Sequence, residues 1–597
     1  MCQVLSPIVF PIKETENYKK LYFNGEKYSI INHNINICEW GILATNTYYN
    51  SFSIEKWKKY TNLENLYLKL VCKGKFQITI VNTMLVFDEV IEKVLEVKYY
   101  DIKDFESITI NLSCYKELKG VLSYKIDAIS KVSIVDGGYY TEDKFDIPRL
   151  GLVICTFKRE KYIESFVCNF LNYKSKQQLK VFIIDNGKSL IFDNLPTEIK
   201  IIPNKNYGGA GGFSRGMLEV KKYNENNKDK LNYIILMDDD ILVDFAIFDK
   251  LIAFLALLKE EYSNYFFAGT MCSLDDKKLQ YERYGFWCGN GFRQISPGYD
   301  LTNLKCILKN EIIENVEFGT AGWWFSCFST NLLGCNNFPF PCFFRGDDVE
   351  YTIRNGFNII TLNGINVWHE PFYKKYSIVS EDYYLLRNTL VINTLYLNWL
   401  RPKDNIKYLF KRFAKSIIKY DYDSAKLIIK ALKDYEKGPS FFEKTDPERL
   451  NNDLSKYNHK LISIDKLIKY YSYKDIIDCI CNENDISKWH KIFRLLTCNG
   501  NLLPGSGVGF SFVGYGARAI NFYRKNRVLN YDPFTYSGYY TNKNLQKTFK
   551  LTIIFIKESI IYYWKFNKIK KDYQCNFHKL QTESFWYKYL NLEEKNE

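Results

Sequence analysis

The sequence predicts a multidomain α/β protein with an N-terminal β-sandwich, a central doubly wound α/β domain and a C-terminal helical domain. Three observations support this division. Alternating segments typical of strands fill the first part, apolar strands alternate with helices in the middle, and helical patterns dominate after Tyr383. Because one core rarely serves 597 residues, we place the domains at 1–147, 148–400 and 401–597.

The N-terminal part, from about residue 28 to residue 147, consists of short predicted strands separated by turns. Apolar and polar residues alternate clearly in Gln77–Val81, and the spacing is typical of a β-sandwich. Nothing here indicates catalysis, so a structural role is favoured over carbohydrate binding. The predicted strands include 66–72, 76–81, 94–99, 107–112 and 120–126.

The pattern changes at Arg149, where strands begin to alternate with helices. Leu150–Thr156 is an apolar strand of the kind found in parallel sheets that are covered on both faces. Such alternation predicts a right-handed, doubly wound sheet. The next predicted elements are a helix at 160–171, strands at 179–184 and 200–203, a helix that ends near residue 223, and a fourth strand at 233–237.

Three consecutive acids, Asp238, Asp239 and Asp240, follow the fourth strand directly. Neighbouring carboxylates repel one another, and burying them without a partner is costly. Mg²⁺ and Mn²⁺ prefer carboxylate oxygens, and open α/β sheets bind ligands at the carboxyl ends of their strands. The acids therefore indicate a divalent metal site, and a solvated acidic turn is the simpler alternative.

A glycine-rich stretch, 204–216, opens the helix before that strand. Its glycines allow a ligand to approach the backbone closely, and a helix start presents free N–H groups to an anion. The stretch has neither the lysine of a Walker loop nor the spacing of a dinucleotide fingerprint. Such a turn is more often an ordinary loop than a phosphate site.

Together with later motifs, these features resemble family 2 glycosyltransferases of the GT-A fold, and among them the bacterial galactofuranosyltransferases that polymerise galactan. The matching motifs occur in the same order over most of residues 40–400. They are Thr156–Arg159, Asp185–Gly187, Asn206–Gly212, Asp238–Asp240, Gly322–Trp324, Phe343–Tyr351, Val367–Glu370 and Leu386–Asn388, together with Thr45–Tyr49 and Trp57–Thr61 near the N-terminus.

The resemblance assigns a role to each motif. It implies that Asp238, Asp240 and His369 bind Mn²⁺ or Mg²⁺, and that Asp348 is the general base with Asp347 beside it. It also implies contacts to the sugars of the acceptor from Trp323 and Trp324. The residues implied in binding the nucleotide sugar are Phe157, Arg159, Asn186, Asn206, Gly208, Gly209 and Asp239.

Simpler structural explanations exist for several of these residues. A single histidine such as His369 is usually structural. The acids at 347 and 348 also suit a helix start, with Asp at the N-cap and Glu350 in the first turn. Adjacent tryptophans can belong to a core, but two in a row rarely both fit inside, so we expect at least one of them to line a cleft.

The activity implied by the resemblance is metal-dependent transfer of galactofuranose from UDP-galactofuranose to a hydroxyl of a lipid-linked cell-surface glycan. A single carboxylate base and an activated leaving group predict direct displacement with inversion. One alternative is another family 2 transferase, for example one that uses dTDP-rhamnose. A second is a non-catalytic glycan-binding protein with a degenerate transferase domain, against which the intact acids and histidine argue.

Charge and cysteine content limit the partners and the compartment. The formal charge is +14, no secretory leader is evident at Met1–Pro11, and the sixteen cysteines are scattered. Cys479-Ile480-Cys481 lacks zinc-knuckle spacing, so we expect reduced cysteines in a cytoplasmic protein. The charge suits an anionic membrane or a sugar nucleotide. No nucleic-acid-binding fingerprint is present, so we expect no nucleic acid partner. A homo-oligomer is compatible with the sequence.

The C-terminal part is predicted to be helical at 384–399, 405–419, 423–436, 464–471 and 545–572, and no apolar run reaches the roughly 18 residues that span a bilayer. In the last helix isoleucines alternate with lysines. This pattern suits peripheral binding to the inner face of the cell membrane, or core packing with a solvated basic face. Asn499–Ala519 is predicted to be a mobile loop or a tight hairpin.

Overall fold

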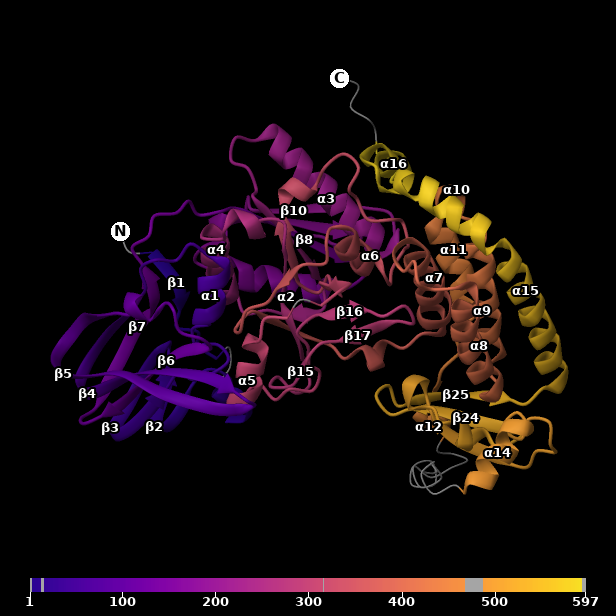
Figure 1. Cartoon of the computed structure of the whole chain (residues 1–597), viewed down its shortest axis with the longest axis horizontal. Coiled ribbons are helices and arrows are strands. Elements are labelled where there is room, and N and C mark those ends of the chain that lie inside the picture. The colour runs from indigo at the N-terminus through magenta and orange to yellow at the C-terminus, as the bar shows by residue number, and fades with distance from the viewer. Residues whose placement is uncertain (1–2, 12–15, 315, 468–486, 593–597) are drawn as a thin grey trace.

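Three parts follow one another along the long axis of the molecule (Figure 1). The computed structural model describes residues 3–11, 16–314, 316–467 and 487–592. A β domain lies at one end, an α/β domain lies in the middle, and helices with a small sheet form the other end. The α/β centre and the mainly helical C-terminal part agree with the predicted fold class, whereas the domain bounds stay predictions.

In the described residues of the N-terminal domain, seven strands are accompanied by a short helix, α1 (Ile54–Tyr60). The strands are β1 (Gln3–Pro7), β2 (Asn24–Ile31), β3 (Asn34–Ala44), β4 (Tyr67–Val86), β5 (Glu89–Asn111), β6 (Val121–Ala128) and β7 (Val132–Thr141). They form one network in the order β1-β7-β3-β6-β4-β5, with β2 paired to β3. Because β7 pairs with both β3 and β4, the ladder returns on itself around an apolar core. The two-layer sandwich stays a prediction.

Two long strands replace four of the short strands predicted in this domain. β4 contains 76–81 and all but the first residue of 66–72, and β5 contains 94–99 and all but the last residue of 107–112. The register shifts between Cys72 and Gly74, and Gly74 has a φ of +122°. Such a bulge bends a strand without ending its pairing, and the sequence pattern shows it as an interruption.

The central sheet has the predicted order of strands and helices. Its elements are β8 (Leu150–Thr156), α2 (Glu160–Leu171), β9 (Leu179–Asp185), β10 (Ile199–Pro203), α3 (Gly208–Asn226), β11 (Tyr233–Asp238), α4 (Ala246–Ala256), β13 (Phe266–Ala268), β19 (Ser326–Ser329) and β20 (Ile359–Ile360). The strands lie in the order β10-β9-β8-β11-β19-β13-β20. The first four are parallel, and β19 is antiparallel to β11 and β13.

The glycines of α3 allow this helix to pack closely against β8. A Cβ at Gly212 would lie 2.1 Å from the Sγ of Cys155, and a Cβ at Gly216 would lie 2.1 Å from a methyl group of Val153. The two glycines are one helical turn apart, so they form a flat face against the strand. Much of the glycine-rich pattern is therefore explained by packing of the helix on the sheet.

A second, four-stranded sheet lies beside the carboxyl end of β11. It contains β12 (Ile241–Leu242), β21 (Asn366–His369), β14 (Thr270–Ser273) and β15 (Gln280–Glu282), in that order. Ile241 pairs with His369 across the β12–β21 ladder. This sheet therefore brings the segment that contains His369 next to the acidic turn.

The C-terminal region is mainly helical, as predicted. Its helices are α7 (Leu385–Tyr396), α8 (Pro402–Ile418), α9 (Tyr422–Tyr435), α10 (Ser440–Lys444), α11 (Pro447–Ser455), α12 (Ile464–Leu467), α14 (Lys488–Leu496), α15 (Leu545–Asn576) and α16 (Glu583–Tyr589). Residues of α7 share one apolar core with α8, α9 and α15. The predicted helix 464–471 is described only to Leu467, and Cys479-Ile480-Cys481 lies outside the described residues.

The segment Asn499–Ala519 contains an ordered strand, which corrects the prediction of a loop or hairpin. This strand, β23 (Val508–Phe512), pairs in parallel with β24 (Arg527–Asp532). The sheet is completed by β25 (Ser537–Asn542) and β22 (Ile462–Ser463). The strand that pairs with β23, β24, follows later in the sequence, and the local sequence pattern of 499–519 cannot reveal this pairing.

Helix α15 forms the outer edge of the C-terminal region (Figure 1). One face is buried against α8 and α9, and its buried residues recur every three or four positions. Among the described residues, no helix combines the length and the apolar character needed to cross a membrane. Every cysteine within the described ranges is free.

Candidate metal and catalytic site

The acidic turn lies where the structure of an open α/β sheet places its ligands. Asp238 is the last residue of β11, whose preceding residues Ile234–Met237 are buried. β11 runs parallel to β8, so Asp238 lies beside Cys155 at the carboxyl ends of both strands. The predicted position of the acids at this edge is therefore confirmed.

Asp238, Asp240 and His369 converge into one group. Each of the three offers a ligand atom, and these atoms all lie within 4.8 Å of one another. The Nε2 of His369 is 3.6 Å from Oδ2 of Asp238 and 3.4 Å from Oδ1 of Asp240. The Nδ1 of His369 lies 2.5 Å from the carbonyl oxygen of Glu370, which orients the ring. Two carboxylates and one imidazole suit a divalent cation such as Mn²⁺ or Mg²⁺.

Burial and neighbouring charges set the protonation of this group. Asp240 is 2% exposed and His369 is 1% exposed, whereas the Asp238 side chain is 38% exposed and faces outward. Burial alone would lower the pKa of His369, but Asp238 and Asp240 raise it to about 9. Burial would raise the pKa of Asp240, but His369, Lys375 and Arg159 together hold it below its usual range.

Asp239 is held by its own protein neighbours. Its Oδ2 accepts a hydrogen bond of 2.7 Å from the Thr156 hydroxyl, and its Oδ1 lies 2.6 Å from Nη1 of Arg159. The same Arg159 nitrogen is 2.9 Å from Oδ2 of Asp240. Arg159 therefore braces the acidic turn, and its side chain is still 38% exposed toward the edge of the sheet.

The second acidic pair, Asp347 and Asp348, opens helix α6 (Asp347–Arg354). The N-cap is Gly346, at φ +106°, and no side chain caps the helix. This corrects the alternative in which an aspartate is the N-cap, because only glycine adopts that φ without strain. Glu350 is buried and pairs with Arg354 at 2.9 Å, so it stabilises the helix.

Burial gives Asp348 the pKa of a plausible general base. Burial raises its pKa to about 6, the charge of Asp238 adds to the rise, and the N–H of Val349 and the charge of Arg345 oppose it. Burial and the charge of Asp348 also raise the pKa of Asp347. Asp238 shifts the pKa of both residues, so the second acidic pair lies within electrostatic range of the candidate metal site.

The loop before Asp347 is braced from two sides. On one side, Ala210 donates a 3.0 Å backbone hydrogen bond to the carbonyl of Phe343. On the other, the Leu386–Asn388 motif on α7 supplies side-chain donors: Arg387 bonds to the Cys342 carbonyl at 2.7 Å, and Asn388 bonds to the carbonyls of Phe344 and Arg345 at 3.0 and 2.7 Å. That motif therefore positions the loop that leads to Asp347 and Asp348.

Several residues expected to bind the nucleotide sugar make contacts within the protein. The amide of Asn186 donates to the Gly208 carbonyl at 3.0 Å, and the side chain of Asn206 accepts from the Gly208 N–H at 3.2 Å. Gly208, at φ +70°, leaves no room for a Cβ, which would lie 2.1 Å from the Phe343 carbonyl oxygen. Gly209 lies near Asp347, and Phe157 is exposed. Their roles toward a nucleotide stay predictions.

The tryptophan pair does not line an open cleft, which corrects the expectation for Trp323 and Trp324. They are only 4% and 7% exposed, because they enter two different hydrophobic cores. Trp323 packs against Phe213, with ring centroids 5.1 Å apart, and Trp324 donates from Nε1 to the Gly269 carbonyl at 3.1 Å. The ring of Trp324 lies 6.4 Å, centroid to centroid, from that of Phe372, which in turn packs against His369.

One residue near the site, Glu282, was missed by the sequence analysis. It ends β15, is buried, and one of its carboxylate oxygens, Oε2, has no hydrogen-bond partner among the described residues. Burial, reinforced by the charge of Asp348 and opposed by that of His369, raises its pKa to about 8. The strand Gln280–Glu282 carries no motif, so only pairing of β15 with β14 reveals its position.

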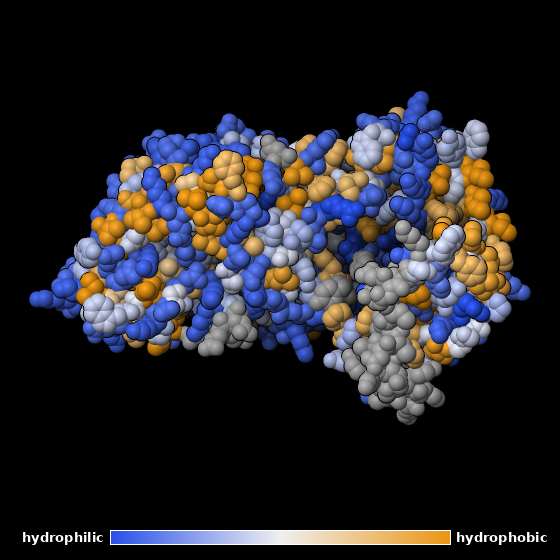
Figure 2. Space-filling view, turned by 60° about the horizontal axis from the view of Figure 1, so that its bottom comes forward, coloured by the Kyte–Doolittle hydropathy of each residue, from blue (hydrophilic) through white to orange (hydrophobic). Residues whose placement is uncertain are grey.

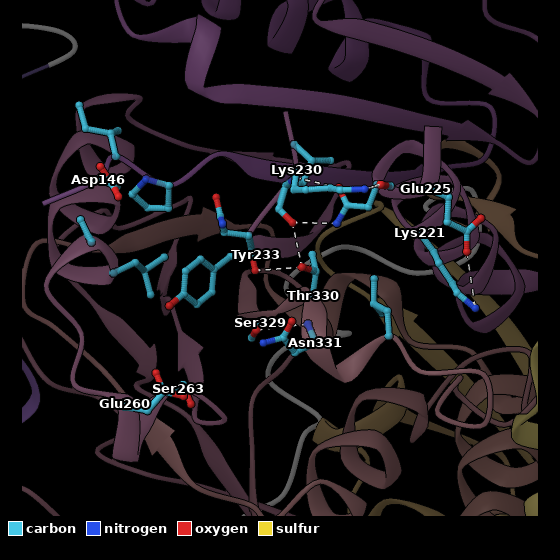
Figure 3. Close-up of a pocket in the computed structure, with 18 residues that line it drawn as sticks. Asp146, Lys221, Glu225, Lys230, Tyr233, Glu260, Ser263, Ser329, Thr330 and Asn331 are labelled. Atoms are coloured by element: carbon cyan, nitrogen blue, oxygen red, sulfur yellow. Dashed lines mark hydrogen bonds and ion pairs between the residues drawn. The ribbon is translucent and has the colours of Figure 1, made fainter. Parts of the chain in front are cut away.

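A cavity of about 650 Å³ lies at the amino end of β11, opposite the carboxyl end that carries Asp238 (Figure 3). Tyr233, Ser329, Asp146 and Glu260 are among the residues that line it. Tyr233 begins the strand that Asp238 ends, and a six-residue strand separates the two by about 17 Å. This cavity is therefore not part of the metal site.

Two family models match parts of this chain. Residues 5–142 match the family described as galactofuranosyltransferase 2 N-terminal, and residues 152–303 match glycosyl transferase family 2. Over these ranges the chain is therefore similar to GlfT2-like glycosyltransferases of family 2, in agreement with the resemblance that the sequence motifs indicate.

The relatives that define this likeness are two proteins named galactofuranosyltransferase GlfT2. The one from Mycobacterium tuberculosis is 22% identical over 431 residues, which cover 66% of this chain and 65% of the relative. The one from Mycolicibacterium smegmatis is 22% identical over 427 residues, with 66% and 64% covered. The match thus spans just under two thirds of each relative's length.

A solved structure of Staphylococcus aureus TarS residues 1–349 in complex with UDP-GlcNAc covers 51% of this chain and 83% of its own, at 13% identity. Its TM-score is 0.31, and at that value the likeness adds nothing to the assignment.

Proposed function

We propose that this protein transfers galactofuranose from UDP-galactofuranose to a hydroxyl group of a lipid-linked glycan acceptor, with inversion at the anomeric carbon. The observation that carries the proposal is one arrangement of side chains. Asp238, Asp240 and His369 form a divalent cation site, and Asp348 lies within its electrostatic range with a pKa raised toward neutrality. The likeness to two galactofuranosyltransferases supports the choice of donor sugar.

The chemistry divides among the residues of the site. A divalent cation at Asp238, Asp240 and His369 supplies Lewis-acid neutralisation of a leaving diphosphate when it is bound. Asp348 accepts the proton of the attacking hydroxyl, because its raised pKa makes it a better base while it remains ionised near neutral pH. With one such base and an activated leaving group, direct displacement inverts the configuration.

Glu282 completes the acceptor side in this proposal. Its raised pKa of about 8 keeps most of it protonated at neutral pH. Neighbouring side chains cover its unpaired oxygen in this structure, so it donates a hydrogen bond to a sugar hydroxyl only after the acceptor has displaced them. It lies close enough to Asp348 and His369 for their charges to shift its pKa. Asp348 thus serves as the base and Glu282 as a hydrogen-bond donor, because their environments give the two carboxyl groups different pKa values.

We also propose that the enzyme binds peripherally to an anionic membrane on the cytoplasmic side, where a lipid-linked acceptor would be held. The outer face of α15 exposes apolar side chains, and a groove of about 360 Å³ runs between it and Phe410 of α8. Figure 2 shows hydrophobic side chains along the end of the molecule that α15 forms. Lys550, Lys557, Lys565 and Lys568 are exposed on the same helix, and such a basic, apolar helix suits anionic lipid.

The decisive experiment is a donor screen with purified protein, Mn²⁺ and a galactofuranoside acceptor. We expect turnover of UDP-galactofuranose and none of dTDP-rhamnose, with the Asp348→Asn variant as the inactive control. Turnover of dTDP-rhamnose alone would replace the donor assignment and keep the mechanism. If wild type and Asp348→Asn show the same turnover with every donor, the proposed catalytic function is wrong and a glycan-binding role replaces it.

A further inference from the structure

Lys375 places an ammonium group inside the proposed metal site. It ends the short turn Phe372–Lys375, which follows strand β21 and His369. Its Nζ contacts Oδ2 of Asp240, the same oxygen that lies 2.9 Å from Arg159. Asp240 therefore has two cationic neighbours on one oxygen, and His369 on the other.

The two cations on Asp240 differ in their freedom to move. The Nη1 of Arg159 also contacts Asp239 at 2.6 Å, so this one nitrogen is held between two carboxylates. Lys375 is a point charge on a flexible stem, and its side chain is 27% exposed. The ammonium can therefore leave Asp240 by rotation of its own stem.

The turn that carries Lys375 is anchored on both sides. The Phe372 ring packs 5.1 Å from the ring of His369. After Lys375, the ring of Tyr376 lies against Gly514, where a Cβ would come within 2.8 Å of it. Because the backbone is held at both ends, the range of the ammonium is limited to the immediate surroundings of Asp240.

We propose that Lys375 is a movable counter-ion. It neutralises Asp240 before a divalent cation binds, and it turns to the diphosphate of the donor once the cation has taken over Asp240. This inference rests on the proposed function. A divalent cation bound to Asp240 repels an ammonium held on the same carboxylate, and a displaced ammonium finds its best nearby acceptor in phosphate oxygen. Binding of metal and binding of nucleotide are thereby coupled.

The coupling is tested by measuring the two ligands separately. Mn²⁺ binding without nucleotide is followed by the electron paramagnetic resonance of free Mn²⁺, and UDP binding at saturating Mn²⁺ is followed by calorimetry. In Lys375→Met we expect Mn²⁺ to bind about fivefold more tightly, because the competing charge is gone, and UDP to bind about tenfold more weakly, because a charge-assisted hydrogen bond is lost.

The neighbouring lysine provides a matched control. Lys374 belongs to the same turn but pairs with Asp275 at 2.8 Å, so Lys374→Met should change neither affinity. Lys375→Arg retains the charge and should restore most of the UDP affinity. Thermal unfolding of each variant shows that the fold is retained.

Two results separate this inference from the proposed function. If wild type fails to bind Mn²⁺ even with UDP present, the metal-dependent function fails and the inference fails with it. If wild type binds Mn²⁺ and Lys375→Met stays within about twofold of it for either ligand, or binds Mn²⁺ more weakly, the inference alone is overturned.

Discussion

Ile241 and His369 are paired across the antiparallel ladder of β12 and β21. Ile241 directly follows Asp240, so this one rung fixes the histidine beside the acidic turn, with 3.4 Å between Nε2 of His369 and Oδ1 of Asp240. The metal site therefore depends on backbone pairing as much as on its ligands.

Removal of one metal ligand should weaken metal binding specifically. His369→Ala leaves two carboxylates, so we expect Mn²⁺ affinity to fall about 10- to 100-fold, measured by calorimetry. Asp275→Asn is the control, because Asp275 pairs with Lys374 outside the triad. Equal Mn²⁺ affinity in His369→Ala and wild type would exclude the histidine as a ligand.

Activity should depend on the ionised form of Asp348. Because its pKa is raised to about 6, the carboxylate gains a proton as the pH falls through that value, and kcat/KM should decline below about pH 6. A bound cation favours the ionised form of Asp348 and moves the decline in kcat/KM to a lower pH. Asp348→Asn should reduce kcat by about 10²- to 10⁴-fold. A pH profile that stays flat down to pH 4.5 would contradict this role.

Glu282 should affect the acceptor more than the donor. Loss of its hydrogen bond in Glu282→Ala should raise the acceptor KM by about tenfold and leave the donor KM unchanged. Glu282→Gln retains a donor and should lie between this variant and wild type. The control is Glu314→Gln, since Glu314 pairs with Arg283 and is half exposed. A rise in the donor KM instead would place Glu282 beside the donor and contradict its proposed role toward the acceptor.

The same residue has a predictable effect on stability. The pKa of Glu282 is about 8 in the folded protein and about 4.5 when unfolded, so the unfolded chain loses the proton first and stability falls as pH rises between these values. Glu282→Gln should remove this part of the pH dependence. The melting temperatures of wild type and Glu282→Gln at pH 5 and pH 8 measure this effect. If the difference between the two pH values is the same in both proteins, Glu282 is already ionised in the folded protein.

The close contact between α3 and β8 predicts a large effect for one small substitution. Gly212→Ala places a Cβ 2.1 Å from the Sγ of Cys155 and should lower the free energy of unfolding by about 1–3 kcal/mol, measured with urea. Gly334→Ala is the control, because nothing lies within 4 Å of a Cβ there. If both variants unfold at the same urea concentration, the helix can shift away from the strand.

Membrane binding can be tested on the outer face of α15. Ile553, Ile560 and Trp564 are 67%, 54% and 81% exposed, and changing all three to Ser should abolish co-sedimentation with vesicles that contain phosphatidylglycerol. Val94→Ser on β5 is the control for an exposed apolar residue elsewhere. Sedimentation of the triple variant at the wild-type level would mean that α15 does not face the membrane.

The sequence by itself determined the elements whose signals are local. The apolar strands from Leu150 to Met237, the helices between them and the acids at 238–240 follow from patterns within a few residues. The motif resemblance then identified His369 and Asp348, which lie far from those acids in the chain.

Only the tertiary structure decided which side chains share a surface or a core. It placed Glu282 and Lys375 in the site, buried both Trp323 and Trp324, and showed that Gly212 serves packing on Cys155. These outcomes depend on pairing between segments that are distant in the sequence. A local pattern specifies the period and polarity of a strand or helix, whereas its neighbours are chosen by how all the elements pack together.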